Sequence, residues 1–460
     1  MKNEARYSYA LLHLAIVLSC TLLAACKYEA VEQSAAQVND ANTSQPAPAD
    51  FQLPLCDGEC TCDEVSIAFN DTGSQLAGDF PAGNFASCNN QSGFLQDCDI
   101  GADATQNQDL DGHAGFSFTK LDNAGNRIND MSETASCVLD NVTGLIWEVK
   151  TFAGSGGLQD ANHTYTWRDD NFGAFSSING GDCDRDCDSQ SYLARLNQQA
   201  LCGYNDWRLP SKIELQEIVN YHTNTPAIDR NFFPHTKTAF YWSNTLDVDD
   251  EGSVWAVDFN VGRVAGGVSS TTRHIRAVRG FDRILQQLQP PTNEEQEIES
   301  RRRYAPQQRC NAIEANTAPT IRYKQDQNGN VLDTLTGLIW QKCVVGLSGD
   351  NCEQGEAEKL DWQQAFEYAN TLNDNTPNAQ PWRLPSIKEL QQNIELACEE
   401  PPLNPFAFKN IPFGEVWSAT PNPRNDDASY HYQYQNSIVF YSSRQTKHHV
   451  HLVRSCQSTF

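Results

Sequence analysis

The sequence predicts an α+β fold built from two tandem copies of one domain. Each copy is expected to hold a small, mostly antiparallel sheet and two short helices, stapled by disulfides. Three observations lead to this prediction. A set of short segments recurs in the same order, and these segments show alternating strand patterns and amphipathic helical patterns. A third is the number of cysteines in a chain that starts like an exported protein.

The repeat is visible as landmarks that return in order along the chain. Thr143-Gly-Leu-Ile-Trp147 recurs as Thr336-Gly-Leu-Ile-Trp340, and Trp207-Arg-Leu-Pro-Ser211 recurs as Trp382-Arg-Leu-Pro-Ser386. Further pairs follow at the spacing of the second pair: Trp242-Ser243 with Trp417-Ser418, and Val278-Arg279 with Val453-Arg454. Chance does not plausibly produce such an ordered set, so the sequence indicates a duplication.

The repeat spacing also sets the domain boundaries. We expect the first copy at 109–282 and the second at 304–460, joined by a polar linker at 283–303. Residues 51–108, rich in Cys, Gly and Asn, predict a loop-rich module packed on the first copy. Residues 26–50, rich in Ala, Gln, Ser and Pro, predict a disordered tether.

Within each copy the elements follow from spacing. The stretch from Trp362 to Leu372 places its apolar residues on one helical face. Ser211 and Ser386 are expected N-caps, each with a glutamate three residues on to complete a capping box. Val254–Phe259 and His274–Arg279 alternate as strands do. The six repeated tryptophans are expected in the core rather than on a ligand.

The N-terminus is typical of an export signal. Lys2 and Arg6 precede an apolar stretch of about 17 residues, near the lower limit for spanning a bilayer. The stretch ends in Leu23-Ala24-Ala25-Cys26, which looks like the cleavage box of bacterial lipoproteins. We therefore expect residues 1–25 to be a signal peptide, and Cys26 to carry a lipid that anchors the chain to a membrane, the outer membrane by default. An uncleaved membrane anchor is the alternative.

The cysteines predict disulfides rather than metal sites. Of the 16, Cys20 lies in the signal and Cys26 takes the lipid, which leaves an even number in an oxidising compartment. The first copy has no counterpart of either Cys398 or Cys456, and this joint absence suggests that the two bond to each other. The other pairs are suggested by short spacing in the sequence or by the same kind of joint absence. The expected bonds are Cys398–Cys456, Cys343–Cys352, Cys183–Cys187 and Cys137–Cys202; Cys56, Cys60, Cys62, Cys88, Cys98 and Cys310 stay unassigned.

The formal net charge of −26 argues against a nucleic-acid partner. A local basic face at the end of the second copy remains the best candidate for ligand binding, with Arg444, Lys447, His449 and Arg454. Asp184, Asp186 and Asp188 offer oxygen ligands for calcium, although a solvated loop is the alternative. No other cofactor is expected. No nucleophile motif or phosphate loop is present, so we do not expect an enzyme.

The ordered motifs Asp-x-x-Thr-Gly-Leu-Ile-Trp, Trp-Arg-Leu-Pro-x-x-x-Glu-Leu and Tyr-Trp-Ser resemble the Lcl C-terminal domain family, over about 110–282 and again over 304–457. The resemblance implies a fold related to C-type lectins, and through them to formylglycine-generating enzymes. It also implies a surface protein that binds glycans. The sugar signatures of C-type lectins themselves are absent from the sequence.

Three hypotheses follow. The first is a lipid-anchored envelope protein that binds or adheres to a glycan or a protein without catalysis. The second is a structural or assembly lipoprotein of an envelope or surface-appendage complex. The third is a degenerate formylglycine-enzyme-like fold.

Overall fold

The structure, a computed structural model, describes residues 53–56, 60, 68–78, 85–88, 93–105, 110–170, 180–248, 250, 252–280, 309–310, 317–375 and 380–456. These residues belong to one compact unit, Phe51–Phe460. The predicted signal peptide at 1–25, Cys26, the tether at 26–50 and the linker at 283–303 lie outside the described residues. Within the described chain, every helix is too short or too polar to cross a membrane.

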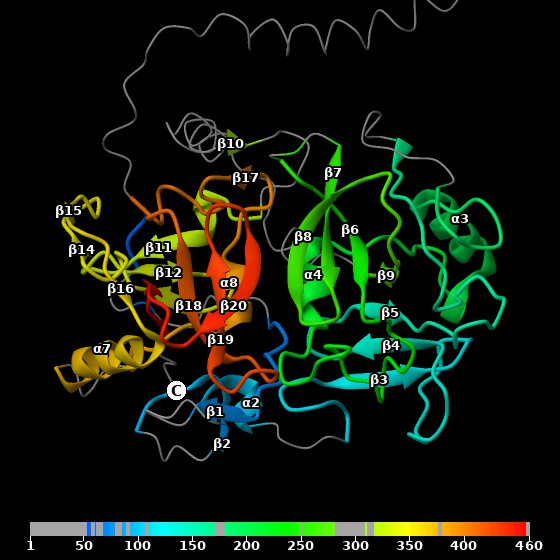
Figure 1. Cartoon of the computed structure of the whole chain (residues 1–460), viewed down its shortest axis with the longest axis horizontal. Coiled ribbons are helices and arrows are strands. Elements are labelled where there is room, and N and C mark those ends of the chain that lie inside the picture. Colours follow the sequence, from blue (N-terminus) through cyan, green and yellow to red (C-terminus); the bar gives the residue numbers. More distant parts are fainter. Residues whose placement is uncertain are drawn as a thin grey trace, which may run out of the picture. The chain divides into compact units, whose positions relative to one another are not determined.

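Within its described residues, the first copy contains two antiparallel sheets and two α-helices (Figure 1). One sheet has the order β3-β4-β5-β9, with β3 (Phe118–Leu121), β4 (Cys137–Asp140), β5 (Ile146–Glu148) and β9 (Val278–Arg279). The other is a meander of β6 (Phe240–Leu246), β7 (Ser253–Asp258) and β8 (Arg263–Val268). The helices are α3 (Ser189–Gln199) and α4 (Lys212–Glu217), with a 3₁₀ turn η4 (Leu201–Gly203) between them.

The second copy repeats this plan. Its four-stranded sheet is β11 (Tyr323–Gln325), β12 (Val331–Asp333), β13 (Leu338–Trp340) and β22 (Val453–Ser455), in that order. Its larger sheet has the order β16 (Lys359–Leu360), β21 (His448–His449), β18 (Glu415–Pro421), β19 (Ala428–Gln433) and β20 (Ile438–Ser443). The helices are α7 (Trp362–Asp374) and α8 (Ile387–Gln392). The predicted α+β class, with mostly antiparallel sheets and few helices, is confirmed.

Smaller elements complete the chain. They are β1 (Leu76–Gly78) paired with β2 (Phe85–Ser87), η2 (Asp97–Asp99), α2 (Gly101–Thr105), β10 (Arg309–Cys310) paired with β17 (Cys398–Glu399), η5 (Thr320–Arg322), and the hairpin of β14 (Leu347–Ser348) and β15 (Gln354–Gly355).

The second helix of each copy begins as predicted. The Ser211 and Ser386 hydroxyls accept hydrogen bonds from the backbone N–H groups of Glu214 and Glu389. Each glutamate carboxylate in turn accepts a hydrogen bond from the backbone N–H of its N-cap serine. Arg208 donates two hydrogen bonds to Glu214, and Arg383 donates two to Glu389, all of 2.6–2.7 Å. A bidentate guanidinium–carboxylate pair therefore fixes the start of α4 and of α8.

The repeated tryptophans lie in the same hydrogen-bonded frame in both copies. The Trp167 indole donates to the Ser243 carbonyl at 2.9 Å, and the Trp362 indole donates to the Ser418 carbonyl at 2.8 Å. Trp362 opens α7, whereas the corresponding helix of the first copy begins only at Ser189. In the first copy, residues 168–188 thus separate the equivalent indole from the helix that follows it.

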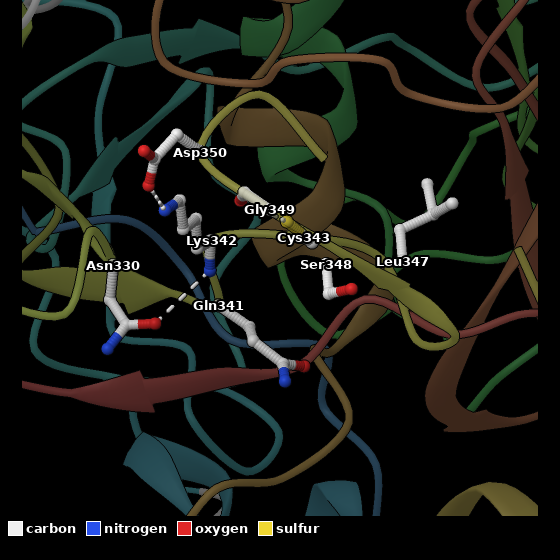
Figure 2. A pocket seen from close by; sticks show the side chains of 8 residues that line it. All are labelled: Asn330, Gln341, Lys342, Cys343, Leu347, Ser348, Gly349 and Asp350. Carbon is white, nitrogen blue, oxygen red and sulfur yellow. Dashed lines mark hydrogen bonds and ion pairs between the residues drawn. The ribbon is translucent and has the colours of Figure 1, made fainter. Parts of the chain in front are cut away.

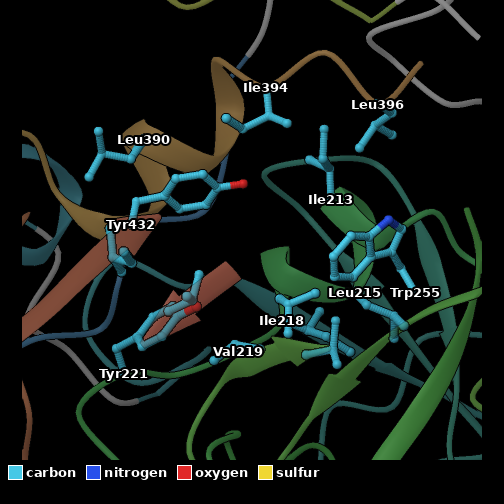
Figure 3. Close-up of a cluster of buried hydrophobic side chains, with 14 of the residues drawn as sticks. Ile213, Leu215, Ile218, Val219, Tyr221, Trp255, Leu390, Ile394, Leu396 and Tyr432 are labelled. Carbon is cyan, nitrogen blue, oxygen red and sulfur yellow. The ribbon is translucent and has the colours of Figure 1, made fainter. Parts of the chain in front are cut away.

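The two copies share one hydrophobic core (Figure 3). Ile213 and Leu215 of α4 belong to the same buried cluster as Leu390 of α8. Equivalent elements meet each other, because α4 contacts α8 and β8 contacts β20. The Glu217 carboxylate accepts a hydrogen bond from the side-chain amide of its repeat equivalent, Gln392. A face that meets its own equivalent is the arrangement of a two-fold symmetric dimer, here within one chain.

The N-terminal segment contacts both copies. The backbone N–H of Asn70 donates to Glu217 in α4, and the Thr72 carbonyl accepts from Tyr221 N–H. On the second copy, Phe94 packs against Phe366 of α7 at 5.9 Å, and β1 and η2 contact β18. The prediction that this module packs on the first copy was incomplete, because the junction between copies lies beneath it.

Five disulfides join described residues: Cys56–Cys60, Cys88–Cys98, Cys137–Cys202, Cys183–Cys187 and Cys343–Cys352. The last three are the predicted pairs. Cys398 and Cys456 are both disulfide-bonded, but the predicted Cys398–Cys456 bond is not among those between described residues. The reason is topological. Cys398 lies in β17 opposite Cys310, whereas Cys456 follows β22 and packs beside Cys60.

Candidate functional site

An open, polar hollow of about 350 Å³ lies on the second copy (Figure 2). It is formed where the turn before β12 meets the residues after β13 and the β14 strand. Its lining consists mostly of amide, hydroxyl, charged and backbone groups, with one partly exposed leucine. The lining residues are Asn330, Gln341, Lys342, Cys343, Leu347, Ser348, Gly349 and Asp350.

One wall is held by a tight turn. Asp326 Oδ1 accepts hydrogen bonds from the backbone N–H groups of Asn328 and Asn330, both at 2.8 Å, and Oδ2 accepts from Asn330 Nδ2. This fixes the Asn330 side chain, whose Oδ1 accepts from Lys342 N–H at 3.2 Å. Arg454 lies 3.7 Å from Asp326 Oδ2 and stacks over the Trp382 ring. Arg454, one of the predicted ligand residues, therefore supports the turn behind the hollow.

The opposite wall is specific to the second copy. The Cys343–Cys352 disulfide closes the loop that carries β14, and the paired strand β15 follows directly after Cys352. Lys342 Nζ lies 3.2 Å from Asp350 Oδ1, and the Asp350 side chain is fully exposed. An ion pair this exposed contributes little to stability, so both groups are free to exchange partners with a ligand. The hollow thus offers an ammonium, a carboxylate, amides and a hydroxyl to solvent.

The predicted basic face does not form. Arg444 is buried, its guanidinium lies 4.3 Å from the Trp362 ring, and its Nε donates to Ser429 Oγ. Burial lowers the Arg444 pKa to about 10. His449 is also buried and donates from Nδ1 to the Glu358 carbonyl. Only Lys447 of the four stays exposed. The sequence alternation could not reveal this, because neighbouring strands and α7 cover both sides of the segment.

The histidines of this region are buried and neutral. Burial lowers the pKa of His451 and of His448 to about 4, and that of His431 to about 3. The His451 Nε2–H donates to the Gln341 carbonyl at 2.8 Å, and its ring packs on Trp340. His451 therefore supports the floor of the hollow from inside.

We expect His451 to destabilise the fold in acid. Its pKa is about 6.5 in the unfolded chain and about 4 in the folded protein, so the unfolded chain binds the proton first. The free energy of unfolding therefore decreases as the pH falls from 6.5 to 4, by about 3 kcal/mol in total. In His451→Gln, whose amide can keep the bond to the Gln341 carbonyl, this part of the pH dependence of the unfolding free energy disappears. Parallel curves for the two proteins between pH 7 and pH 4 would contradict the assignment.

The structure does not bring Asp184, Asp186 and Asp188 together. Asp184 and Asp186 are exposed, whereas Asp188 is buried and caps α3, accepting from the Ser191 N–H at 2.8 Å. Among described residues, a different acidic group converges: Asp71, Asp97 and Asp103. The sequence analysis missed it, because these residues are widely spaced in a segment without a regular pattern.

The chain matches the model of the Lcl C-terminal domain family over residues 136–279 and 329–454. The two matched segments coincide with the two structural copies and together cover more than half of the chain. No curated protein and no solved structure matches the chain. From the matched segments and the repeated Trp-Arg-Leu-Pro helix starts, the chain belongs to the Lcl C-terminal domain family.

Proposed function

We propose that this is a lipid-anchored envelope protein that binds a glycan without catalysis, using the hollow of the second copy. In this proposal Cys26 carries the lipid, the outer membrane is the location, and residues 26–50 hold the binding unit away from the surface. The observation that carries the proposal is the polar lining of the hollow. Family membership supports a C-type-lectin-like fold and a binding role.

The lining suits a ligand with many hydroxyl groups. Asn330 has its amide oriented by the Asp326 turn, and Ser348 adds a hydroxyl that can donate and accept. Lys342 and Asp350 add one charge of each sign. A lining without net charge, on a chain of net charge −26, favours a neutral sugar over a sulfated one, because the overall field repels polyanions.

The test is a glycan array with the purified mature chain, followed by titration of any sugar that binds. We expect the double variant Lys342→Ala/Ser348→Ala to lose at least about tenfold in affinity, equivalent to about 1.4 kcal/mol, with an unchanged melting temperature. Lys447→Ala, which removes an exposed lysine outside the hollow, is the matched control and should bind like the parent. Binding that survives the double variant would place the site elsewhere.

An assembly role is the second candidate, favoured by exposed aromatic side chains. Phe152 of the first copy and Phe413 of the second are 62% and 57% exposed. Such residues often mark contacts with another protein. An empty glycan array, together with capture of a specific envelope protein that Phe413→Ser and Phe152→Ser abolish, would favour assembly over glycan binding.

A further inference from the structure

We propose that Asp71, Asp97 and Asp103 bind a divalent cation, calcium by preference, at the place where the N-terminal segment meets both copies. Each of the three offers one carboxylate oxygen, and these oxygens all lie within 4.8 Å of one another. Asp97 and Asp103 are buried, and Asp71 is partly exposed. The inference does not depend on the proposed glycan site.

The buried negative charge of this group has no matching cation. None of the three carboxylates forms an ion pair within the described chain. Lys388 directs its Nζ to the backbone carbonyls of Asp71 and Glu217, at 2.8 and 2.7 Å, rather than to a carboxylate of the group. Several carboxylates buried together are unfavourable unless a proton or a metal ion compensates them.

A second observation points to a ligand. Asp97 is fully buried, and its Oδ1 makes no hydrogen bond of good geometry, although the Thr420 hydroxyl also interacts with this carboxyl group. A buried carboxylate oxygen without a donor is rare in folded proteins and calls for an ion or a water. The other oxygen, Oδ2, lies 2.7 Å from Thr72 Oγ1, which is also 2.7 Å from Asp103 Oδ2. Because Asp103 Oδ2 also accepts from the Ser74 N–H at 2.8 Å, the single hydroxyl hydrogen of Thr72 can go to Asp97 Oδ2, and the oxygen left without a donor is Asp97 Oδ1.

Calcium is the expected cation because its coordination shell is larger and more flexible than that of magnesium. Calcium–oxygen distances are about 2.3–2.6 Å, so two oxygens on opposite sides of the ion lie about 5 Å apart. For magnesium, at about 2.1 Å, the corresponding limit is near 4.2 Å. Oxygens within 4.8 Å of one another are compatible with a calcium shell, and the exposed edge of Asp71 leaves room for water ligands.

The backbone closes tightly around these carboxylates. Gly115 has φ +69°, and a Cβ there would lie 2.3 Å from Asp103 Oδ1. Gly101 has φ +65°, and a Cβ there would lie 2.3 Å from Asp71 Oδ2. Two glycines in the left-handed region thus allow main chain to approach the oxygens where any side chain would collide. The group is held in place by the fold rather than lying loose on a surface.

The position gives the cation a structural consequence. The Asn70 side chain, next to Asp71, donates to Asp140 of the first copy at 2.6 Å. Asp97 belongs to η2, which contacts β18 of the second copy. A cation that joins Asp71 to Asp97 and Asp103 would therefore fasten the N-terminal segment across the junction.

The experiment uses the mature chain treated with EGTA. Calorimetric titration with calcium chloride is expected to show one equivalent bound per chain, and saturation to raise the melting temperature by about 5 °C. Magnesium chloride at the same concentration should give a smaller shift. No heat and no shift at about 10 mM calcium, well above the range of weak extracellular sites, would overturn the proposal.

Variants assign the response to this group. Asp97→Asn and Asp103→Asn should lose the calcium shift, and in EGTA Asp97→Asn should melt at or above the parent temperature because one repelling charge is gone. If a variant of the buried Asp97 or Asp103 does not fold, Asp71→Asn, at the partly exposed edge of the group, is measured in its place. Asp184→Asn and Asp186→Asn, in the exposed loop, are the controls and should keep the shift. If calcium still raises the melting temperature of Asp97→Asn, Asp103→Asn and Asp71→Asn, the proposal is overturned. It is also overturned if acid raises the melting temperature of the parent by the same amount in calcium as in EGTA.

Discussion

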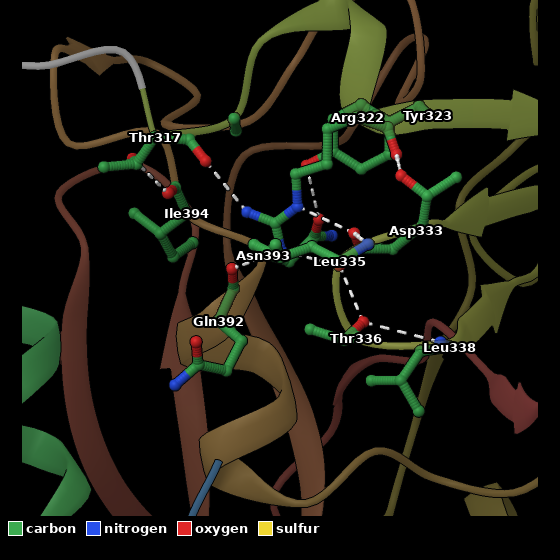
Figure 4. A network of polar contacts seen from close by, with 12 residues as sticks. Thr317, Arg322, Tyr323, Asp333, Leu335, Thr336, Leu338, Gln392, Asn393 and Ile394 are labelled. Carbon is green, nitrogen blue, oxygen red and sulfur yellow. Dashed lines mark hydrogen bonds and ion pairs between the residues drawn. The ribbon is translucent and has the colours of Figure 1, made fainter. Parts of the chain in front are cut away.

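Replacing Arg322 by alanine should lower the free energy of unfolding by about 3–5 kcal/mol, because it leaves the Asp333 carboxylate buried without its counter-charge. Both side chains are almost completely buried, and Arg322 Nε donates to Asp333 Oδ1 at 2.7 Å (Figure 4). The same guanidinium donates to the Thr317 and Gln392 carbonyls at 2.9 and 2.8 Å. Denaturant unfolding of the variant and the parent measures the loss.

Two comparisons make this result specific. Arg454→Ala removes an ion pair of 3.7 Å that is partly exposed, and should cost about 1 kcal/mol or less. Adding Asp333→Asn to Arg322→Ala should recover part of the loss, since the amide carries no charge to bury. If Arg322→Ala unfolds within about 1 kcal/mol of the parent, the network of Figure 4 does not stabilise the second copy as the geometry indicates.

The second large effect is expected at the junction. Lys388→Met should cost about 3 kcal/mol, because Lys388 Nζ satisfies the carbonyls of Asp71 and Glu217 and lies 4.4 Å from the Phe116 ring. Burial lowers the Lys388 pKa to about 8, so the ammonium is retained at neutral pH. Methionine fills a similar volume but offers no donor to either carbonyl.

The matched control is Lys447→Met, which changes an exposed lysine of the same copy and should leave stability within about 0.5 kcal/mol of the parent. Limited proteolysis adds an independent measurement. We expect faster cleavage in the N-terminal segment of Lys388→Met, since this segment loses its contact with α8. Equal cleavage of the two variants would mean that Lys388 does not hold the segment on the junction.

The junction also shows how duplicated sequences become complementary. Lys388 occupies the position of Ile213 in the other copy, and Gln392 occupies that of Glu217. In a symmetric dimer both members of the second pair would be identical, and two facing glutamates would repel each other. The amide at Gln392 instead donates to the Glu217 carboxylate. The difference between the copies thus gives a hydrogen bond at a place where two glutamates would repel each other.

The sequence by itself determined the features that depend on short spacing. The capping boxes at Ser211 and Ser386 follow from a glutamate three residues on, and the buried face of α7 follows from helical periodicity. The local disulfides Cys183–Cys187 and Cys343–Cys352 follow from short loops. The duplication and the family were visible for the same reason, because each landmark is a contiguous segment.

Only the tertiary structure decided the features that depend on which distant surfaces meet. The sequence predicted Arg444 and His449 in an exposed basic face, but α7 and neighbouring strands bury them, and desolvation lowers the pKa of both side chains. Asp71, Asp97 and Asp103 converge only because the loop-rich segment folds over the junction. The two copies form one core because the apolar faces of α4 and α8 are each other's partners, which no pattern within a single copy records.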